Sequence, residues 1–353
     1  KPKRPWSDPP ALAGLLAGWR DAWTGRSVFR VTAGTDWVRI GLAGDSRPGI
    51  MLTSLAGAQL VFTHAGPLPR PLNSALDVTR GHPLSKPLAN SAFGGCGMFP
   101  GDRIAAFRFE NSAGSALYLL HQVFGTRGNT VLLDENAKLL WGRHRPPHAL
   151  LAAVPPGEVW THGTASADGD EVSPAALEQL TEVVAAARAG ETRSRLERKL
   201  RTAQRLVDNL TRDFERAEKG ETYRRRAETL AAHLHELSQG ADAVTLADPR
   251  GEGDMEIPLD PALSPAANME VWFKKARKAD KGRDIIADRL ARAQTDLEDI
   301  SRAAEELIGA LDGGLPPLDR LNNLQDWSRE HVDLFPTATG RQTRGRYGPE
   351  EPA

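Results

Sequence analysis

The strongest constraint on the fold is a heptad repeat in the second half of the chain. Apolar residues alternate steps of four and three over 196–217 and, after a change of phase at Gly220, over 223–237; a second series covers 286–311. Such steps place one apolar seam along a helix, as in a coiled coil. Two such helices joined by a compact connection predict an antiparallel coiled-coil arm over 181–311. A self-contained helical bundle is the alternative, although two helices supply few faces for one.

The connection between the two heptad helices predicts a β-hairpin. Short β-like runs at 243–246 and 255–259 flank a turn rich in Gly and Pro. Pro258 lacks a donor N–H and therefore suits the end of an edge strand. Ser264 is expected to cap the following helix, with Pro265 at its first position, where a missing N–H costs nothing. We therefore expect the hairpin at 243–259 to close the arm and the return helix to begin just after it.

The first 160 residues follow a different pattern, in which short alternating apolar runs are separated by Gly and Pro. This pattern predicts a mixed, β-sandwich-like domain with an opening helix at 11–23 and short helices near 73–77 or 86–91, so the fold class is α+β. The expected strands are 27–33, 37–43, 50–55, 103–110, 116–124 and 129–134. The small, polar and acidic residues within 161–180 predict a linker, and 312–353 is expected to be an extended tail.

Composition excludes several classes of function. The formal net charge of −1 does not indicate a general nucleic-acid binder, so any such evidence must come from local clustering. The single cysteine, Cys96, excludes an intramolecular disulfide and a multi-cysteine metal or iron–sulfur site, and it suits the cytoplasm.

Motifs for catalysis and for membrane insertion are also missing from the sequence. There is no phosphate-binding loop, HExxH motif or nucleophile elbow. The "HRPPH" run at 144–148 is interpreted as a loop. We therefore expect no catalytic residue, cofactor, metal or small-molecule substrate. No apolar run approaches the length of a membrane span, and no hydrophobic region follows the basic start, so we expect no membrane partner.

Particular runs of sequence resemble the NFACT family, which includes fibronectin-binding-protein-A-like proteins and the quality-control factors RqcH and NEMF. The most specific is "LDPALSPAAN" at 259–268, followed by "WFKKARK" at 272–278. Weaker similarity continues through "GDRIAAFRFE" at 101–110 and "GTRGNTVLLDE" at 125–135, so that the resemblance covers roughly 11–311. No counterpart of the family's helix-hairpin-helix domain is expected here, and the tail is expected to lead toward an NFACT-R domain that is absent or truncated.

The resemblance implies a tRNA-binding site in the first domain. Its residues are Asp102, Arg103, Gln122, Val123, Phe124, Arg127 and Asn129. An arginine can bind phosphate through two parallel hydrogen bonds, and an aspartate can fix it in place. Taken without the family, the Asp102–Arg103 pair is better explained as a salt link or turn cap at the entry of a strand, and the resemblance reverses this preference. The sequence departs from the family pattern at 122–124 and at 127–128, where "QVF" and "RG" replace the family's wording.

The arm carries the second predicted interface. Between 191 and 226 there are twelve basic and seven acidic side chains. Solvated flanks of a coiled coil explain mixed charge, while a net positive rod also suits the phosphates of ribosomal RNA. Trp272 and Phe273 are assigned to packing at the junction of helix and hairpin. The residues expected to bind rRNA are Arg198, Lys199, Arg224, Arg225, Lys274, Lys275, Arg277 and Lys278.

Together these features favour an RNA-binding factor of ribosome-associated quality control. The resemblance implies as partners the large ribosomal subunit RNA, tRNA (alanyl-tRNA in the bacterial family) and an obstructed peptidyl-tRNA complex. It also implies support for C-terminal tailing of the stalled chain, in which the ribosome performs peptide transfer. Two alternatives remain open, a fibronectin-binding surface adhesin and a non-catalytic coiled-coil scaffold.

Overall fold

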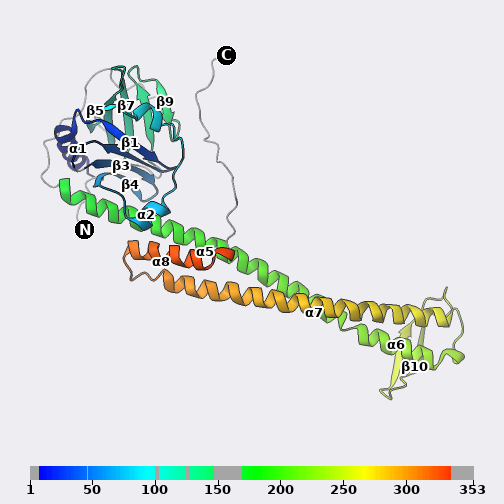
Figure 1. Cartoon of the computed structure of the whole chain (residues 1–353). Helices are drawn as coiled ribbons and strands as arrows, with labels where there is room; N and C mark the ends of the chain where they lie inside the picture. The colour runs from blue at the N-terminus through cyan, green and yellow to red at the C-terminus, as the bar shows by residue number, and fades with distance from the viewer. Residues whose placement is uncertain (1–7, 46, 100–102, 125–127, 147–168, 335–353) are drawn as a thin grey trace, which may run out of the picture. The chain divides into compact units, whose positions relative to one another are not determined.

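The computed structural model describes residues 8–45, 47–99, 103–124, 128–146 and 169–334. The chain divides into two compact units (Figure 1). Unit 1 comprises residues 1–191 and 309–353, and unit 2 comprises 192–308. None of the helices in the described ranges combines the length and apolarity needed to cross a bilayer.

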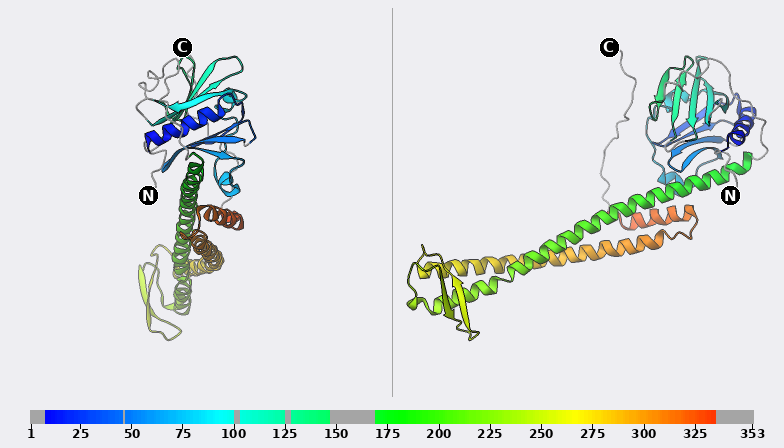
Figure 2. Two further views of the ribbon diagram at one scale, coloured as in Figure 1. Left: turned by 90° about the vertical axis from the view of Figure 1, so that its left-hand side faces the viewer. Right: turned by 180° about the vertical axis from the view of Figure 1, so that it is seen from behind.

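Unit 1 is built on two antiparallel sheets, seen as separate layers in Figure 2. Each sheet has its strands in chain order, and a bridge between Ser27 and Ala92 connects them. The four-stranded sheet contains β1 (Val28–Ala33), β2 (Trp37–Leu42), β3 (Pro48–Leu55) and β4 (Ala58–Ala65). The five-stranded sheet contains β5 (Ala92–Met98), β6 (Ile104–Glu110), β7 (Ala116–Gln122), β8 (Thr130–Asp134) and β9 (Leu139–Gly142).

Each of the six predicted strands is present, and the predicted α+β class is confirmed. Three further strands, β4, β5 and β9, escaped the sequence prediction. Strand β5 reads AFGGCGM, and its three glycines give little strand propensity. It forms because β6 pairs with it along its length and α1 (Pro9–Trp23) packs over it.

The core of unit 1 draws on helices from both ends of the chain. Short helices α2 (Arg70–Ala75) and α3 (Ser85–Leu88) lie close to the predicted positions. Long helix α5 (Gly169–Ala217) buries Ala176, Leu180 and Val184 in the same core. Helix α8 (Pro317–Glu330) packs near α2, where Gln325 donates a hydrogen bond of 2.7 Å to the Pro71 carbonyl.

The boundaries therefore differ from those predicted. Helix α5 begins at Gly169, inside the segment 161–180 expected to be a linker, and α8 and the short η3 (Val332–Leu334) occupy part of the expected extended tail. The physical reason is that both segments pack against residues that are distant in the sequence. Polar and small residues dominate both segments, but their few apolar side chains, such as Leu180 and Leu321, find partners in a core formed far away in sequence.

Unit 2 is the antiparallel arm that the heptads predicted. The part of α5 beyond residue 191 and α7 (Pro265–Ala310) run side by side in opposite directions in both figures. Seam residues Leu196, Leu210, Ala293, Ile300 and Leu307 are buried. The other residues of both series are half-buried, or buried in the case of Ala227 and Leu230, while most positions between them are exposed.

The phase change at Gly220 interrupts the helix. Helix α5 ends at Ala217, and α6 (Gly220–Ala232) begins after a turn; the short η2 (Leu234–Glu236) follows. A β-carbon on Gly220 would lie 3.0 Å from Asp280 Oδ1 and 3.1 Å from the Ala279 β-carbon, so a larger residue would require α7 or its side chains to shift. Strands β10 (Ala243–Ala247) and β11 (Asp254–Pro258) then form the predicted hairpin.

Candidate nucleic-acid interface

The described part of the predicted tRNA site lies at one end of the five-stranded sheet. Val123 N–H donates a hydrogen bond of 2.9 Å to the Arg103 carbonyl, which joins the start of β6 to the end of β7. The Arg103 guanidinium carbon lies 5.8 Å from the centre of the Phe124 ring, within the range of a cation–π contact. Gln122 is half-buried beside them. Asp102 and Arg127 lie outside the described residues.

Two of the residues predicted to bind tRNA, Val123 and Asn129, have buried side chains. Val123 is 4% exposed and belongs to the core of unit 1. Asn129 is 6% exposed, and its side-chain amide donates to the His144 carbonyl (3.1 Å) and accepts from the His144 N–H (3.0 Å). Both ends of the amide are thus used in holding the chain after β9. Contact of either side chain with tRNA stays a prediction.

Arg143 supports this end of the sheet, although sequence reasoning did not identify it. Its guanidinium donates to the carbonyls of Gly128 (2.9 Å) and Ser54 (3.1 Å) and forms an ion pair with Asp36. These groups come from both sheets, so one side chain fixes the loop that carries the predicted site. Gly128 is required there, because a β-carbon would lie 2.8 Å from the Gln122 carbonyl oxygen. No local sequence signal could have revealed partners 15 to 107 positions away.

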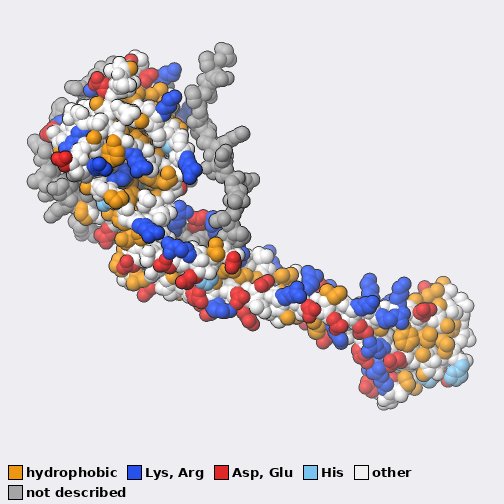
Figure 3. Space-filling model, in the orientation of Figure 1, with side chains coloured by type: hydrophobic (Ala, Val, Ile, Leu, Met, Phe, Trp, Pro, Cys, Tyr) orange, Lys and Arg blue, Asp and Glu red, His pale blue; other side chains and the backbone are white. Residues whose placement is uncertain are grey.

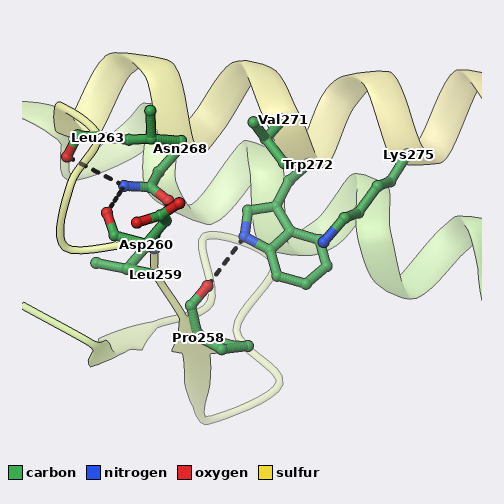
Figure 4. Close-up of a pocket in the computed structure, with 8 residues that line it drawn as sticks. All are labelled: Pro258, Leu259, Asp260, Leu263, Asn268, Val271, Trp272 and Lys275. Carbon is green, nitrogen blue, oxygen red and sulfur yellow. Dashed lines mark hydrogen bonds between the residues drawn. The ribbon is translucent and has the colours of Figure 1, made fainter.

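At the tip of the arm, Trp272 holds the hairpin against α6 and α7. The indole is 6% exposed and packs with Ala227, Leu230, Leu246 and Ile257. Its N–H donates to the Pro258 carbonyl (3.2 Å), as Figure 4 shows. The packing role expected for Trp272 is therefore observed.

The corner before α7 is fixed by Asn268 and Ser264. The Asn268 amide accepts from Asp260 N–H (2.8 Å) and donates to the Asp260 carbonyl (3.0 Å). Ser264 Oγ accepts from the Ala267 N–H (3.2 Å), so the predicted cap is present. A cavity of about 350 Å³ opens beside this corner, lined by Pro258, Leu259, Asp260, Leu263, Asn268, Val271, Trp272 and Lys275 (Figure 4).

Two of the basic residues expected to bind rRNA form ion pairs within the arm. Arg224 pairs with Asp280 and with Glu221, and Arg225 pairs with the buried carboxylate of Asp248 and with Glu252. The Arg250 backbone N–H and the Arg225 side chain hold the pKa of Asp248 below its usual value. Arg224 and Arg225 therefore neutralise carboxylates at the tip, and their predicted contact with rRNA would have to compete with these ion pairs.

Lys274, Arg277 and Lys278 remain exposed, and among the described residues none has an ion-pair partner. Their spacing of three and four places them on one face of α7. Lys275 is also exposed, and its ammonium lies 4.0 Å from the centre of the Trp272 ring. Farther along the arm, Arg198 is exposed and Lys199 is half-buried. Figure 3 shows basic side chains bordering a hydrophobic surface at the arm tip.

The same segment matches a known family. Residues 177–312 match the model of the NFACT N-terminal and middle domains. This part of the chain is similar to the NFACT family. The resemblance predicted from "LDPALSPAAN" is thereby confirmed. The matched residues, called the NFACT segment below, contain the whole of unit 2 and, from unit 1, residues 177–191 and 309–312. No curated protein sequence matches the chain significantly.

Two solved structures show weak similarity to this chain. The fibrinogen binding protein from Staphylococcus aureus aligns with a TM-score of 0.31 at 12% identity, over 46% of this chain and 55% of that one. The N-terminal domain of the fibronectin-binding protein PavA from Streptococcus pneumoniae aligns with a TM-score of 0.33 at 12% identity, over 44% and 62%. The chain thus spans less than two thirds of either, and similarity at this level carries no argument about function.

Within the described residues, no three His, Cys, Asp or Glu side chains come together as a metal site. Of the "HRPPH" run, residues 144–146 lie in a loop and 147–148 fall outside the described ranges.

Proposed function

We propose that this chain is an RNA-binding factor of ribosome-associated quality control. In this proposal the arm binds RNA of an obstructed large ribosomal subunit, and unit 1 binds tRNA, with alanyl-tRNA favoured by family resemblance. Binding would support C-terminal tailing of the stalled chain, and the ribosome would perform the chemistry. A cytoplasmic location belongs to the same proposal.

The observation that carries it is the row formed by Lys274, Arg277 and Lys278 on the NFACT segment. These cations are exposed and unpaired among the described residues, whereas the neighbouring Arg224 and Arg225 are neutralised by carboxylates. Cations without a protein partner can replace the counterions of an RNA phosphate surface, which makes binding favourable and dependent on salt. The row is therefore the part of the arm best suited to rRNA.

The test uses the full chain and purified large ribosomal subunits. The triple variant Lys274→Gln, Arg277→Gln and Lys278→Gln is compared with the control Arg201→Gln, Arg216→Gln and Arg302→Gln. The control arginines are also on the arm, but each is paired with an acidic neighbour, namely Glu197, Asp213 and Asp299. Both variants lose three positive charges, so they differ in the place of the loss and in whether the lost charge was paired.

We expect the first variant alone to bind the subunit weakly in cosedimentation. If three phosphate contacts are lost, the slope of log affinity against log salt should become shallower by about 2 to 3. Equal effects of the two triple variants would contradict the proposal. Unchanged subunit binding accompanied by fibronectin binding would favour the adhesin alternative instead.

For tRNA, Arg103→Ala is the corresponding variant, and Arg80→Ala is its control because Arg80 is exposed in the same unit. Filter binding of aminoacylated tRNA should weaken for Arg103→Ala and remain unchanged for the control. If both variants bind tRNA like the original chain, the tRNA part of the proposal is wrong.

A further inference from the structure

A second surface of unit 1 combines an exposed aromatic ring with two arginines. Phe29, on β1, is 53% exposed. The pairing of β1 with β2 shifts between Val28↔Leu42 and Arg30↔Gly41, which makes Phe29 the extra residue of a β-bulge. A bulge sets two successive residues opposite one residue of the partner strand and redirects a side chain. Phe29 and Arg30 therefore both stand opposite Gly41.

Two paired glycines bring the Phe29 ring and Arg39 together. A β-carbon on Gly41 would lie 2.8 Å from the Phe29 ring, and one on Gly49 would lie 2.6 Å from Arg39 Nε. Gly41 and Gly49 are direct partners across β2 and β3. Directly paired positions share one face of a sheet, about 4.5–5.5 Å apart. The aromatic ring and the Arg39 guanidinium are therefore neighbours on that face, and Arg30 is paired beside them.

Within the described ranges, no carboxylate compensates the charge of either arginine. Arg39 donates to the carbonyl oxygens of His64 and Gly66, and no ion pair to a carboxylate is found for Arg39 or Arg30 among the described residues. Burial and the nearby Arg30 charge lower the pKa of Arg39. Arg39 Nε is also buried without a hydrogen-bond partner in the described structure. Two cations held together in this way destabilise the fold, and a bound anion would relieve the repulsion.

We propose that Phe29, Arg30 and Arg39 form a platform that binds a nucleotide of single-stranded RNA. The base stacks on the Phe29 ring, and a backbone phosphate lies against the two guanidinium groups. An aromatic face beside cations is the combination that single-stranded nucleic acids require, whereas an acidic peptide would use only the charges. Figure 3 shows basic side chains beside hydrophobic ones over the region of β1 to β3.

This platform goes beyond the proposed function. It contains none of the residues predicted to bind tRNA or rRNA, and it belongs entirely to the four-stranded sheet of unit 1. RNA can therefore bind here whether or not the arm binds the ribosome.

The test measures binding of a fluorescein-labelled 12-nucleotide poly-U RNA by anisotropy. It uses the full chain carrying Lys274→Gln, Arg277→Gln and Lys278→Gln, so that the arm row does not contribute. Phe29→Ala and Arg30→Gln are compared with Arg80→Gln, since all three positions are exposed and Arg80 lies elsewhere in unit 1. Circular dichroism melts confirm that each variant is folded.

We expect Phe29→Ala and Arg30→Gln each to weaken binding about fivefold or more, the lower end of the effect of losing one stacked base. Phe29→Tyr, which keeps the ring, should bind normally, and a duplex of the same length should bind with no dependence on Phe29. Ultraviolet cross-linking should label the peptide that contains 28–33.

Equal binding by Phe29→Ala and Arg80→Gln, or cross-links found only outside β1 and β2, would overturn the inference. The arm variant is the background of all these RNA measurements, so its own effect on subunit binding does not change them. The failure of one proposal can therefore be told from the failure of the other.

Discussion

The buried imidazole of His121 should make the stability of unit 1 depend on pH. The side chain lies on β7 and is fully buried, with Nδ1 2.8 Å from the Thr130 hydroxyl oxygen. Its Nε2 is buried without a hydrogen-bond partner among the described groups. Burial, aided by the charge of Arg143 and opposed by the backbone at Thr53 and Leu60, lowers the pKa of His121 to about 4. The perturbation that tests this is His121→Gln, which cannot titrate but can still hydrogen-bond Thr130.

The sign and size of the effect follow from linkage. Between pH 6.5, the ordinary value, and about 4, the unfolded chain binds a proton at His121 that the folded chain does not. Stability therefore rises with pH in this window: the contribution is complete above about pH 6.5 and is lost as pH falls toward 4. A shift of about 2.5 pH units corresponds to about 3 kcal/mol of unfolding free energy at 1.36 kcal/mol per unit.

The assay is urea unfolding followed by tryptophan fluorescence. Trp272 is the one tryptophan of unit 2 in the sequence, so a Trp272→Phe background confines the signal to unit 1. We expect the unfolding free energy to fall between pH 7 and pH 4.5 by about 2 kcal/mol more with His121 than with His121→Gln. His82, whose pKa is also lowered by burial, is present in both proteins and cancels. If both proteins show the same pH dependence, His121 is not the buried neutral group described here.

Three further predictions concern packing. Trp272→Ala should destabilise the arm tip by about 3–5 kcal/mol, seen as faster hydrogen exchange in peptides of β10 and β11, and Trp272→Phe should do so much less; equal exchange in the two would contradict the anchoring role. Gly128→Ala should destabilise the end of the five-stranded sheet by about 1–3 kcal/mol, because its β-carbon would press on the Gln122 carbonyl; unchanged exchange across β7 and β8 would refute this. Gly220→Ala should separate α6 from α7 and lower the melting temperature, whereas Gly190→Ala, at an open helix position, should not.

Local rules were sufficient where the pattern is long or the chemistry of a turn is specific. The heptads located both arm helices, since an apolar stripe repeated over several turns has few ways to be buried. The Ser264 cap and the hairpin followed from prolines and turn residues adjacent in sequence. Strands β5 and β9 were missed because pairing with neighbours, rather than their own composition, stabilises them.

For the candidate sites, the sequence by itself determined which residues are basic or aromatic, and its motifs indicated the resemblance to the NFACT family. Only the tertiary structure decided which charges are available. Arg224 is neutralised by Asp280, 56 positions away, whereas Lys274 and Arg277 on the same arm keep their charge exposed. The bulge at Phe29 and the pairing of Gly41 with Gly49 likewise could not be predicted before the strand register was known. The physical reason is the same in each case: charge compensation and exposure depend on groups brought close by folding, and sequence order does not record those distances.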